Sequence, residues 1–292
     1  MHIYGHEENV ALLSEAVRSL VRDPSPAVRA MAIRTLSAMM RHRPQQAVEL
    51  FVELSLHRDD RILAGRDAHE FLRFAGARYF TDLRPVIERM VESANSAVRM
   101  RGAVQAALAA LDEAAAHPLA ERCLLGDPAL RLGVAQVVAA NLTNATFRAR
   151  CEDEIVGMFE DDDAEVRKAA VQVWRELADE DFADSDRLVD AFLKSPAFDP
   201  AGATALLQAL DLAQAPPPVL SLRACGAVLD AGFGSADAVG GSVTLHELGE
   251  LSLRAYADAA DLSGRNAALD VIDRMLELDS FRFGHALSDY ER

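Results

Sequence analysis

The stretch Asp23-Pro-Ser-Pro-Ala-Val28-Arg29-Ala-Met-Ala32 joins a polar turn to an aliphatic residue that is followed by arginine. The same phrase returns with its aliphatic residue and arginine at Val98-Arg99, Leu130-Arg131 and Val166-Arg167. Successive aliphatic positions are 70, 32 and 36 residues apart, and a fainter copy at Leu63 divides the first interval into two of 35. A period of about 35 residues built from helical segments predicts an α-solenoid, which is a stack of helix pairs.

The composition agrees with an all-α fold. Half of the residues are hydrophobic but only 6% are aromatic, so the core must consist of small and aliphatic side chains. No apolar run reaches the length of a membrane-spanning helix, and no membrane partner is expected. The first residues lack the basic and apolar regions of a signal peptide. Cys123, Cys151 and Cys225 are far apart in helical patterns and are predicted to be buried thiols of a reducing compartment. We therefore expect a cytoplasmic protein.

Apolar periodicity and helix-capping residues define about five to six helix pairs. Ser25 is a favourable N-cap and Pro26 suits the first helical position, while Asp163 opens a later helix in the same way. If the second helix of each pair faces the shared core, the aliphatic residues of the later phrases should be buried. Val28 should be more exposed, because the first pair lacks a neighbour on its outer side. The expected pairs span residues 8–42, 44–78, 82–111, 114–142, 146–178 and, more weakly, 185–213.

The pattern changes after about residue 195. The prolines of 216–218 interrupt any helix, and the glycine-rich stretch 232–242 is predicted to be a flexible loop. Helical periodicity then resumes. We therefore expect a repeat array over 1–195 and, on the same continuous solenoid, a degenerate repeat with an irregular helical cap over 196–292. A modified last unit covers the terminal core face that would otherwise aggregate.

An aliphatic-arginine phrase after an acidic or polar turn resembles the HEAT repeat family, and the resemblance covers residues 8–178. It implies an α-α superhelix in which the aliphatic residue packs in the core. It also implies a ladder in which Asp and Arg of successive repeats pair. Ala64 in the second pair predicts a break in this ladder, which should end after the fifth pair. The candidate ladder residues are Arg29, Arg99, Arg131 and Arg167.

The rear of the chain resembles the extreme C-terminus of large bacterial signal-transducing NTPases of the NACHT-like kind, many of which are linked to phage defence. The resemblance lies in Leu253-Arg-Ala-Tyr256, in residues 268–278 and in the final Tyr290-Glu-Arg292, and 85–93 is similar to the repeat arrays of the same proteins. In those proteins the helical array senses a ligand or keeps the ATPase inactive. We expect Met1 to be a boundary within a longer protein, or another domain or subunit to cover this end.

The sequence lacks the motifs that are typical of catalytic and metal-binding sites. There is no P-loop motif, and the glycines of 232–242 do not follow a strand. A helical-repeat hydroxylase family binds iron through His-Glu pairs at equivalent repeat positions. In this chain His-Glu dipeptides begin at His6, His69 and His246. Their spacings of 63 and 177 residues are not whole numbers of 35-residue repeats, so no iron site is expected. The acidic stretch 179–190 lacks the glycine and glutamate of a calcium-binding EF-hand loop. No catalytic, cofactor-binding or metal-binding residue is predicted, and the chain is not expected to be an enzyme.

Charge is unevenly distributed along the chain. Residues 1–110 carry 15 arginines and 13 acidic residues, whereas 111–292 carry 15 basic and 33 acidic residues. The acidic rear repels phosphate backbones, so nucleic acid is not an expected partner, although docking of a basic protein stays open. An alternative is a HEAT-like nucleic-acid-binding or DNA-glycosylase-like protein that uses the arginines of 58–101. Its candidate basic face consists of Arg66, Arg73 and Arg84.

These observations favour a non-catalytic protein-interaction scaffold. We expect it to act as a sensor or regulatory repeat array, as part or partner of a larger NTP-dependent bacterial protein of the defence type. The expected partner is a protein that binds the concave face, which one helix of each pair would line. No cofactor is expected.

Overall fold

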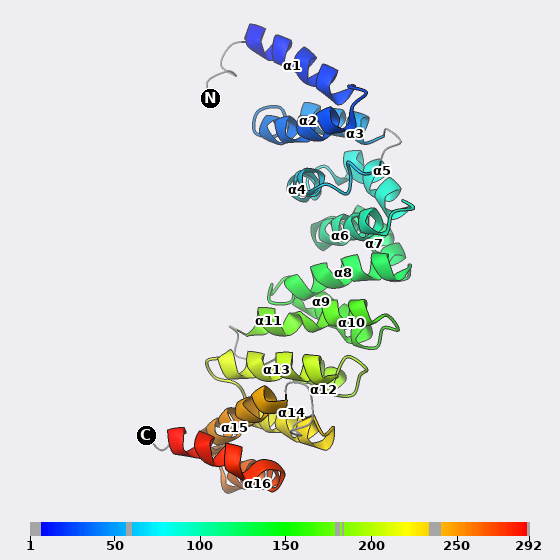
Figure 1. The fold of residues 1–292 in the computed structure, drawn as a ribbon. Helices are drawn as coiled ribbons and strands as arrows, with labels where there is room; N and C mark the ends of the chain where they lie inside the picture. Colours follow the sequence, from blue (N-terminus) through cyan, green and yellow to red (C-terminus); the bar gives the residue numbers. More distant parts are fainter. Residues whose placement is uncertain (1–6, 57–59, 179–181, 183, 234–240, 291–292) are drawn as a thin grey trace. The chain divides into compact units, whose positions relative to one another are not determined.

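The fold is all-α over the part of the chain that the structure describes. The computed structural model describes the backbone of residues 7–56, 60–178, 182, 184–233 and 241–290, and the side chains of 14–56, 60–178, 182, 184–233 and 247–278. These residues form helices and turns, with no strand among them. The chain divides into two compact units, Met1–Val137 and Val138–Arg292. Each unit is a stack of helix pairs, which confirms the predicted HEAT-like solenoid (Figure 1).

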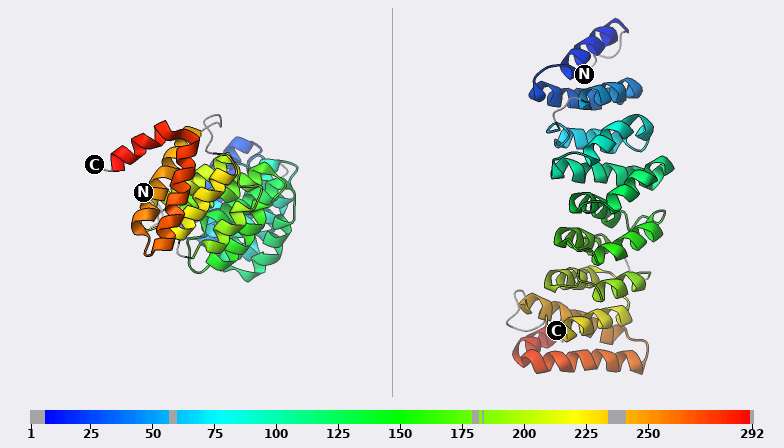
Figure 2. Two further views of the ribbon diagram at one scale, coloured as in Figure 1. Left: turned by 90° about the horizontal axis from the view of Figure 1, so that it is seen from below. Right: turned by 90° about the vertical axis from the view of Figure 1, so that its right-hand side faces the viewer.

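The first unit holds the first four predicted helix pairs. Its second helices pack both on their own partners and on the neighbouring pairs: α2 contacts α1, α3 and α4, while α6 contacts α4, α5 and α7. The resulting layers are visible in Figure 2. The elements are α1 (Glu7–Val21), α2 (Pro26–Met39), α3 (Pro44–Ser55), α4 (Arg66–Ala75), α5 (Phe80–Val91), α6 (Ser96–Asp112), a 3-10 turn η2 (Ala114–Ala116), α7 (His117–Leu124) and α8 (Pro128–Ala140).

The second unit continues the pairing and ends in three helices that pack on one another. The second helix of the fifth pair is divided in two, and α14, α15 and α16 contact each other as a terminal group. One expectation was wrong in part: the loop predicted over 232–242 ends earlier, because Gly241 and Ser242 already belong to α15. Residues 234–240 lie outside the described part. The elements are α9 (Arg148–Phe159), α10 (Ala164–Val171), α11 (Val173–Leu177), α12 (Asp186–Leu193), α13 (Pro200–Leu212), α14 (Pro218–Asp230), α15 (Gly241–Asp258) and α16 (Leu262–Tyr290).

Helix starts follow the predicted residues, with one difference in how the cap is made. Asp163 caps α10, accepting hydrogen bonds from the backbone N–H groups of Glu165 and Val166. Ser25 occupies the N-cap of α2 and Pro26 follows it, but the Ser25 hydroxyl makes no capping hydrogen bond. The Asp23 carboxylate instead accepts from the Ser25 backbone N–H at 2.8 Å. The turn, rather than the serine side chain, therefore fixes this helix start.

The aliphatic residue of the phrase is a core residue, as predicted. Val98 and Val166 are fully buried and Leu130 is 7% exposed, whereas Val28 is only half-buried. A glycine allows the close approach of α6 to α5: a Cβ atom at Gly102 would lie 2.7 Å from the Cβ atom of Met90. Because such a contact is too short, a larger side chain at this position would force the two helices apart.

Aromatic side chains form the core of the second unit near the fifth pair. The Trp174 ring is fully buried, with its centroid 5.1 Å from that of Phe192 and 6.0 Å from that of Phe159. Phe182, in the connection between α11 and α12, stacks on Trp174 with ring centroids 6.5 Å apart. Edge-to-face and stacked pairs at these separations are favourable. The side chain of Trp174 therefore packs in the core.

Candidate functional site

The arginine of each phrase folds back onto the turn that precedes its own helix. The Nη1 atom of Arg29 donates to the carbonyl of Asp23 at 2.7 Å, and Arg99 donates to the carbonyl of Ser93 at the same distance. Arg131 and Arg167 do the same with the carbonyls of Gly126 and Asp161, again at 2.7 Å. Each guanidinium thus satisfies a carbonyl that the end of the first helix leaves without a helical partner. We call this contact the turn clamp.

The predicted ladder is distinct from the turn clamp. Arg99 does reach the next repeat, since its Nε atom lies 2.9 Å from Oδ2 of Asp127. The contact is an ion pair rather than a hydrogen bond, because the Arg99 Nε atom has no hydrogen-bond partner. A continuous ladder through all four arginines stays a prediction. The geometry described for every one of them is the clamp within its own turn.

The second pair, in which Ala64 replaces the arginine, has its turn held from the next repeat. Arg101 of α6 donates to the carbonyl of Ala64. Arg89 of α5 donates to the carbonyl of Ser55, and its Nη2 atom lies 2.6 Å from Oδ1 of Asp60. Where the phrase lacks its own arginine, two arginines of the third pair therefore take over the role of the clamp.

The predicted basic face is largely neutralised within its own helices. Arg66 pairs with Glu70 at 2.7 Å on α4, and Arg84 pairs with Glu88 at 2.8 Å on α5. The hydrogen bond that Arg66 donates to Glu70 raises the pKa of Arg66. Arg73 lies two turns beyond Arg66 on α4 and is exposed. Pairs at this helical spacing leave little net positive charge for a phosphate backbone. The nucleic-acid alternative stays a prediction, which electrophoretic shifts at low salt would test.

Many of the acidic residues are also used within the fold. In the second unit Arg187 pairs with Asp153 at 2.6 Å, and Arg223 pairs with both Asp186 and Asp190, at 2.6 and 3.0 Å. These pairs join one repeat to the next. Exposed pairs of this kind contribute little individually, on the order of 0–1 kcal/mol. Part of the acidic excess is thus paired within the stack itself.

Within the described residues the side chains that the sequence offers for catalysis are engaged or buried; His6 and the side chain of His246 lie outside this part. Among the described residues no group of histidine, cysteine and carboxylate side chains could hold a metal ion. The Nδ1 atom of His69 lies 3.0 Å from the side-chain amide of Gln105. Burial lowers the pKa of His69, and the positive charges of Arg101 and Arg73 lower it further. Burial raises the pKa of Cys225 to about 12. A thiol with such a pKa is protonated at neutral pH and is a poor nucleophile. Within its described residues the chain has no helix long and apolar enough to cross a bilayer.

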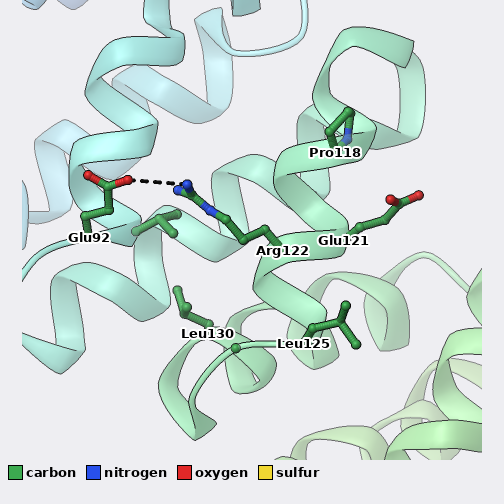
Figure 3. A pocket seen from close by; sticks show the side chains of 8 residues that line it. Glu92, Pro118, Glu121, Arg122, Leu125 and Leu130 are labelled. Carbon is green, nitrogen blue, oxygen red and sulfur yellow. Dashed lines mark hydrogen bonds and ion pairs between the residues drawn. The ribbon is translucent and has the colours of Figure 1, made fainter.

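An open groove of about 690 Å³ lies within the first unit, where α5 and α7 end and α8 begins. Val91 and Leu130 form a buried apolar floor, at 4% and 7% exposure. Leu125, just past the end of α7, is 86% exposed and forms the lip. Figure 3 shows Arg122 reaching from α7 toward Glu92, with Leu130 beneath this pair. The remaining lining residues are Pro118, Glu121 and Gly126.

The charged rim of the groove is exposed and loosely held. Glu92 and Arg122 are 3.3 Å apart, with side chains 66% and 48% exposed. Such a pair is weak, because water competes for both groups. The groove has no nucleophile or metal-ligand set, but it offers an apolar surface beside carboxylates. It can therefore bind a side chain of a partner and hold an adjacent charge.

This groove is not apparent from the hydrophobic pattern of the sequence, although the sequence carries a signal for it. In the first, third and fifth phrases a polar residue stands six positions before the arginine, whereas Leu125 has this place before Arg131. The fourth turn is also one residue shorter, because Arg131 clamps the carbonyl five residues back instead of six. Leu125 resembles a core leucine until the copies of the phrase are aligned on their arginines.

Comparison with known proteins agrees with the repeat architecture. The HEAT repeat family model matches residues 13–43, which cover most of the first helix pair. No curated protein matches the chain. The crystal structure of an engineered protein is similar at 15% identity over 90% of this chain and 96% of the other, with a TM-score of 0.30, too low to support any argument about this chain. The family match and the stacked helix pairs of both units together support a HEAT-repeat protein.

Proposed function

We propose that the chain is a non-catalytic protein-interaction array. The observation that carries this proposal is the groove beside Leu125, which exposes apolar surface that the fold does not need for its own packing. HEAT repeats suggest an interaction scaffold in general, and extended helical stacks offer long surfaces for partners. The described polar clusters have a structural role. Their guanidinium groups bind the carbonyls of turns and the carboxylates of neighbouring repeats.

The array serves as a sensor or regulatory element, as part or partner of a larger NTP-dependent bacterial protein of the defence type. The support is the likeness of the rear segment to the tails of such NTPases. Residues of this segment form α15 and α16, which pack closely on each other. A partner would bind the concave face formed by one helix of each pair. The protein would act in the cytoplasm.

The test begins with the coding sequence upstream and beside the gene. A reading frame that carries a P-loop module should be found there, either continuous with this chain or next to it. The two products, expressed together, should elute as one complex on size-exclusion chromatography, and the NTPase rate should differ from that of the module without the array. An isolated gene with no such neighbour, or two products that elute separately with an unchanged NTPase rate, would contradict the proposal.

A further inference from the structure

The fourth turn differs from the other turns in a way that packing does not require. In three phrases the polar residue six positions before the arginine accepts a hydrogen bond from the backbone N–H two residues on. Leu125 replaces this acceptor and is 86% exposed, the most exposed of the large hydrophobic side chains described. It therefore contributes neither to the turn nor to the core. The three acceptors are Asp23 at 2.8 Å, Ser93 at 3.2 Å and Asp161 at 2.8 Å.

The turn is built so that Leu125 stands beside an apolar floor. The chain passes close to the floor at Gly126, where a Cβ atom would lie 2.6 Å from the Cδ1 atom of Leu130. The clamp of Arg131 on the Gly126 carbonyl holds the turn in place. The groove thus offers an outside side chain an apolar floor at Val91 and Leu130, with Leu125 exposed at its lip. Well-packed apolar anchors of this type supply most of the affinity of protein interfaces.

The electrostatics of the groove favour a positively charged neighbour. The C-terminal ends of α5 and α7 both border it, and helix C-termini carry partial negative charge. Glu92 and Glu121 add two carboxylates to the lining, against the single guanidinium of Arg122. The exposed pair of Arg122 with Glu92 is weak enough for a second cation to share the Glu92 carboxylate.

We propose that this groove binds a short segment of a partner protein that inserts one aliphatic or methionine side chain between Leu125 and Leu130. A lysine or arginine next to that side chain pairs with Glu92 or with Glu121, which lie on opposite sides of α7 (Figure 3). This inference rests on the proposed interaction function and names the chemistry of the partner at one site. Anchors and charges of this kind give affinity through the apolar side chain, and specificity and association rate through the charge.

The test uses a displayed library of random peptides about 12 residues long, enough to present an anchor with its flanking residues. Peptides are selected on the full chain alone, so that the variants stay an independent test. A selected peptide is then labelled, and its affinity is measured by fluorescence polarisation. The matched controls are Leu212→Ser, which replaces a leucine that is 68% exposed on α13, and Glu165→Arg, which reverses a carboxylate that is 70% exposed on α10.

We expect selected peptides to combine an aliphatic or methionine residue with a nearby lysine or arginine. Leu125→Ser should weaken binding about tenfold or more, as expected for loss of an interface anchor. Glu121→Arg should weaken basic peptides and reverse the preference toward acidic flanks, and binding to wild type should weaken as salt is raised. Both control variants should bind within about twofold of wild type, because exposed residues outside an interface contribute little.

Several results would overturn this assignment. These are the absence of any selected peptide, selected peptides without basic residues, or equal effects of Leu125→Ser and Leu212→Ser. Circular dichroism checks that Leu125→Ser stays folded, which its exposure predicts. If peptides bind but ignore both groove variants, the groove assignment is wrong and the interaction function stands. If the groove binds its peptides while no complex forms with an NTPase module, the regulatory proposal is the one that fails.

Discussion

Replacing Val98 and Val28 by alanine makes the same chemical change at equivalent positions of two phrases, in different surroundings. Val98 is fully buried between neighbouring helices, whereas Val28 is half-buried. Losing two methyl groups costs about 1.6 kcal/mol in transfer free energy, from ~0.8 kcal/mol for each group. With the added cavity term we expect Val98→Ala to lower the free energy of unfolding by about 2–3 kcal/mol, and Val28→Ala by less than about 1 kcal/mol.

The position of the single tryptophan makes the assay selective. Trp174 lies in the second unit, so its fluorescence reports on that unit, while far-UV circular dichroism reports on helices throughout the chain. In urea, Val98→Ala should move the early part of the dichroism transition to lower denaturant by about 1 M, for a slope of about 2 kcal/mol/M. The fluorescence transition should move less, because in a repeat array the loss of one contact acts on its neighbours.

The reasoning would be refuted by a particular pattern. If both variants lowered one sharp transition equally, and both probes followed the same curve, the chain would be a single cooperative globule. The half-burial of Val28 would then have no energetic meaning, and the description of the molecule as a stack of repeats would have to be withdrawn.

Three further predictions follow from the caps, the clamp and the buried thiols. Asp163→Ala should cost about 0.5–2 kcal/mol in thermal or urea unfolding because it removes a helix cap, while Ser25→Ala should cost almost nothing because that hydroxyl caps no backbone group. Arg99→Met should cost about 1.5–3 kcal/mol, the value of a charge-assisted hydrogen bond, and a cycle with Asp127→Asn should assign no more than about 1 kcal/mol of it to the ion pair. Cys225, whose pKa is raised to about 12, should not react with a thiol reagent in the folded protein at pH 8, but should react in urea. Because the folded thiol keeps its proton above the ordinary pKa of 9.0, stability should fall as pH rises above 9.

The sequence predicted the helix pairs well because one phrase contains several agreeing signals. In Asp161–Arg167 a capping carboxylate, an aliphatic core position and an arginine occur at fixed spacing, and each of them has a separate physical role in the turn. The predicted bounds of the pairs therefore lie within a few residues of the observed helices. The glycine-rich segment was less predictable, since Gly241 opens a helix that tertiary packing stabilises in spite of its low helix propensity.

The candidate site was much harder to predict than the fold. Hydrophobic periodicity assigns every leucine to the core. Leu125 differs in that it replaces a polar residue of the phrase and in that its turn is one residue shorter. The role of the phrase arginine was also not apparent from the residue types, because a guanidinium can equally well pair with a carboxylate or a carbonyl. Its partners depend on the path of the turn, and this path is set by the contacts of the surrounding helices.

The turn clamp also bears on how arrays of this type change length during evolution. Donor and acceptor lie five or six residues apart, so recombination that duplicates or deletes one helix pair moves both together. The second pair is the exception, because Arg89 and Arg101 of the third pair hold its turn. Deleting the third pair would leave the Ser55 and Ala64 carbonyls without their donors. Loss of the third pair should therefore destabilise the second, while a pair with its own arginine keeps its clamp when it is duplicated or moved.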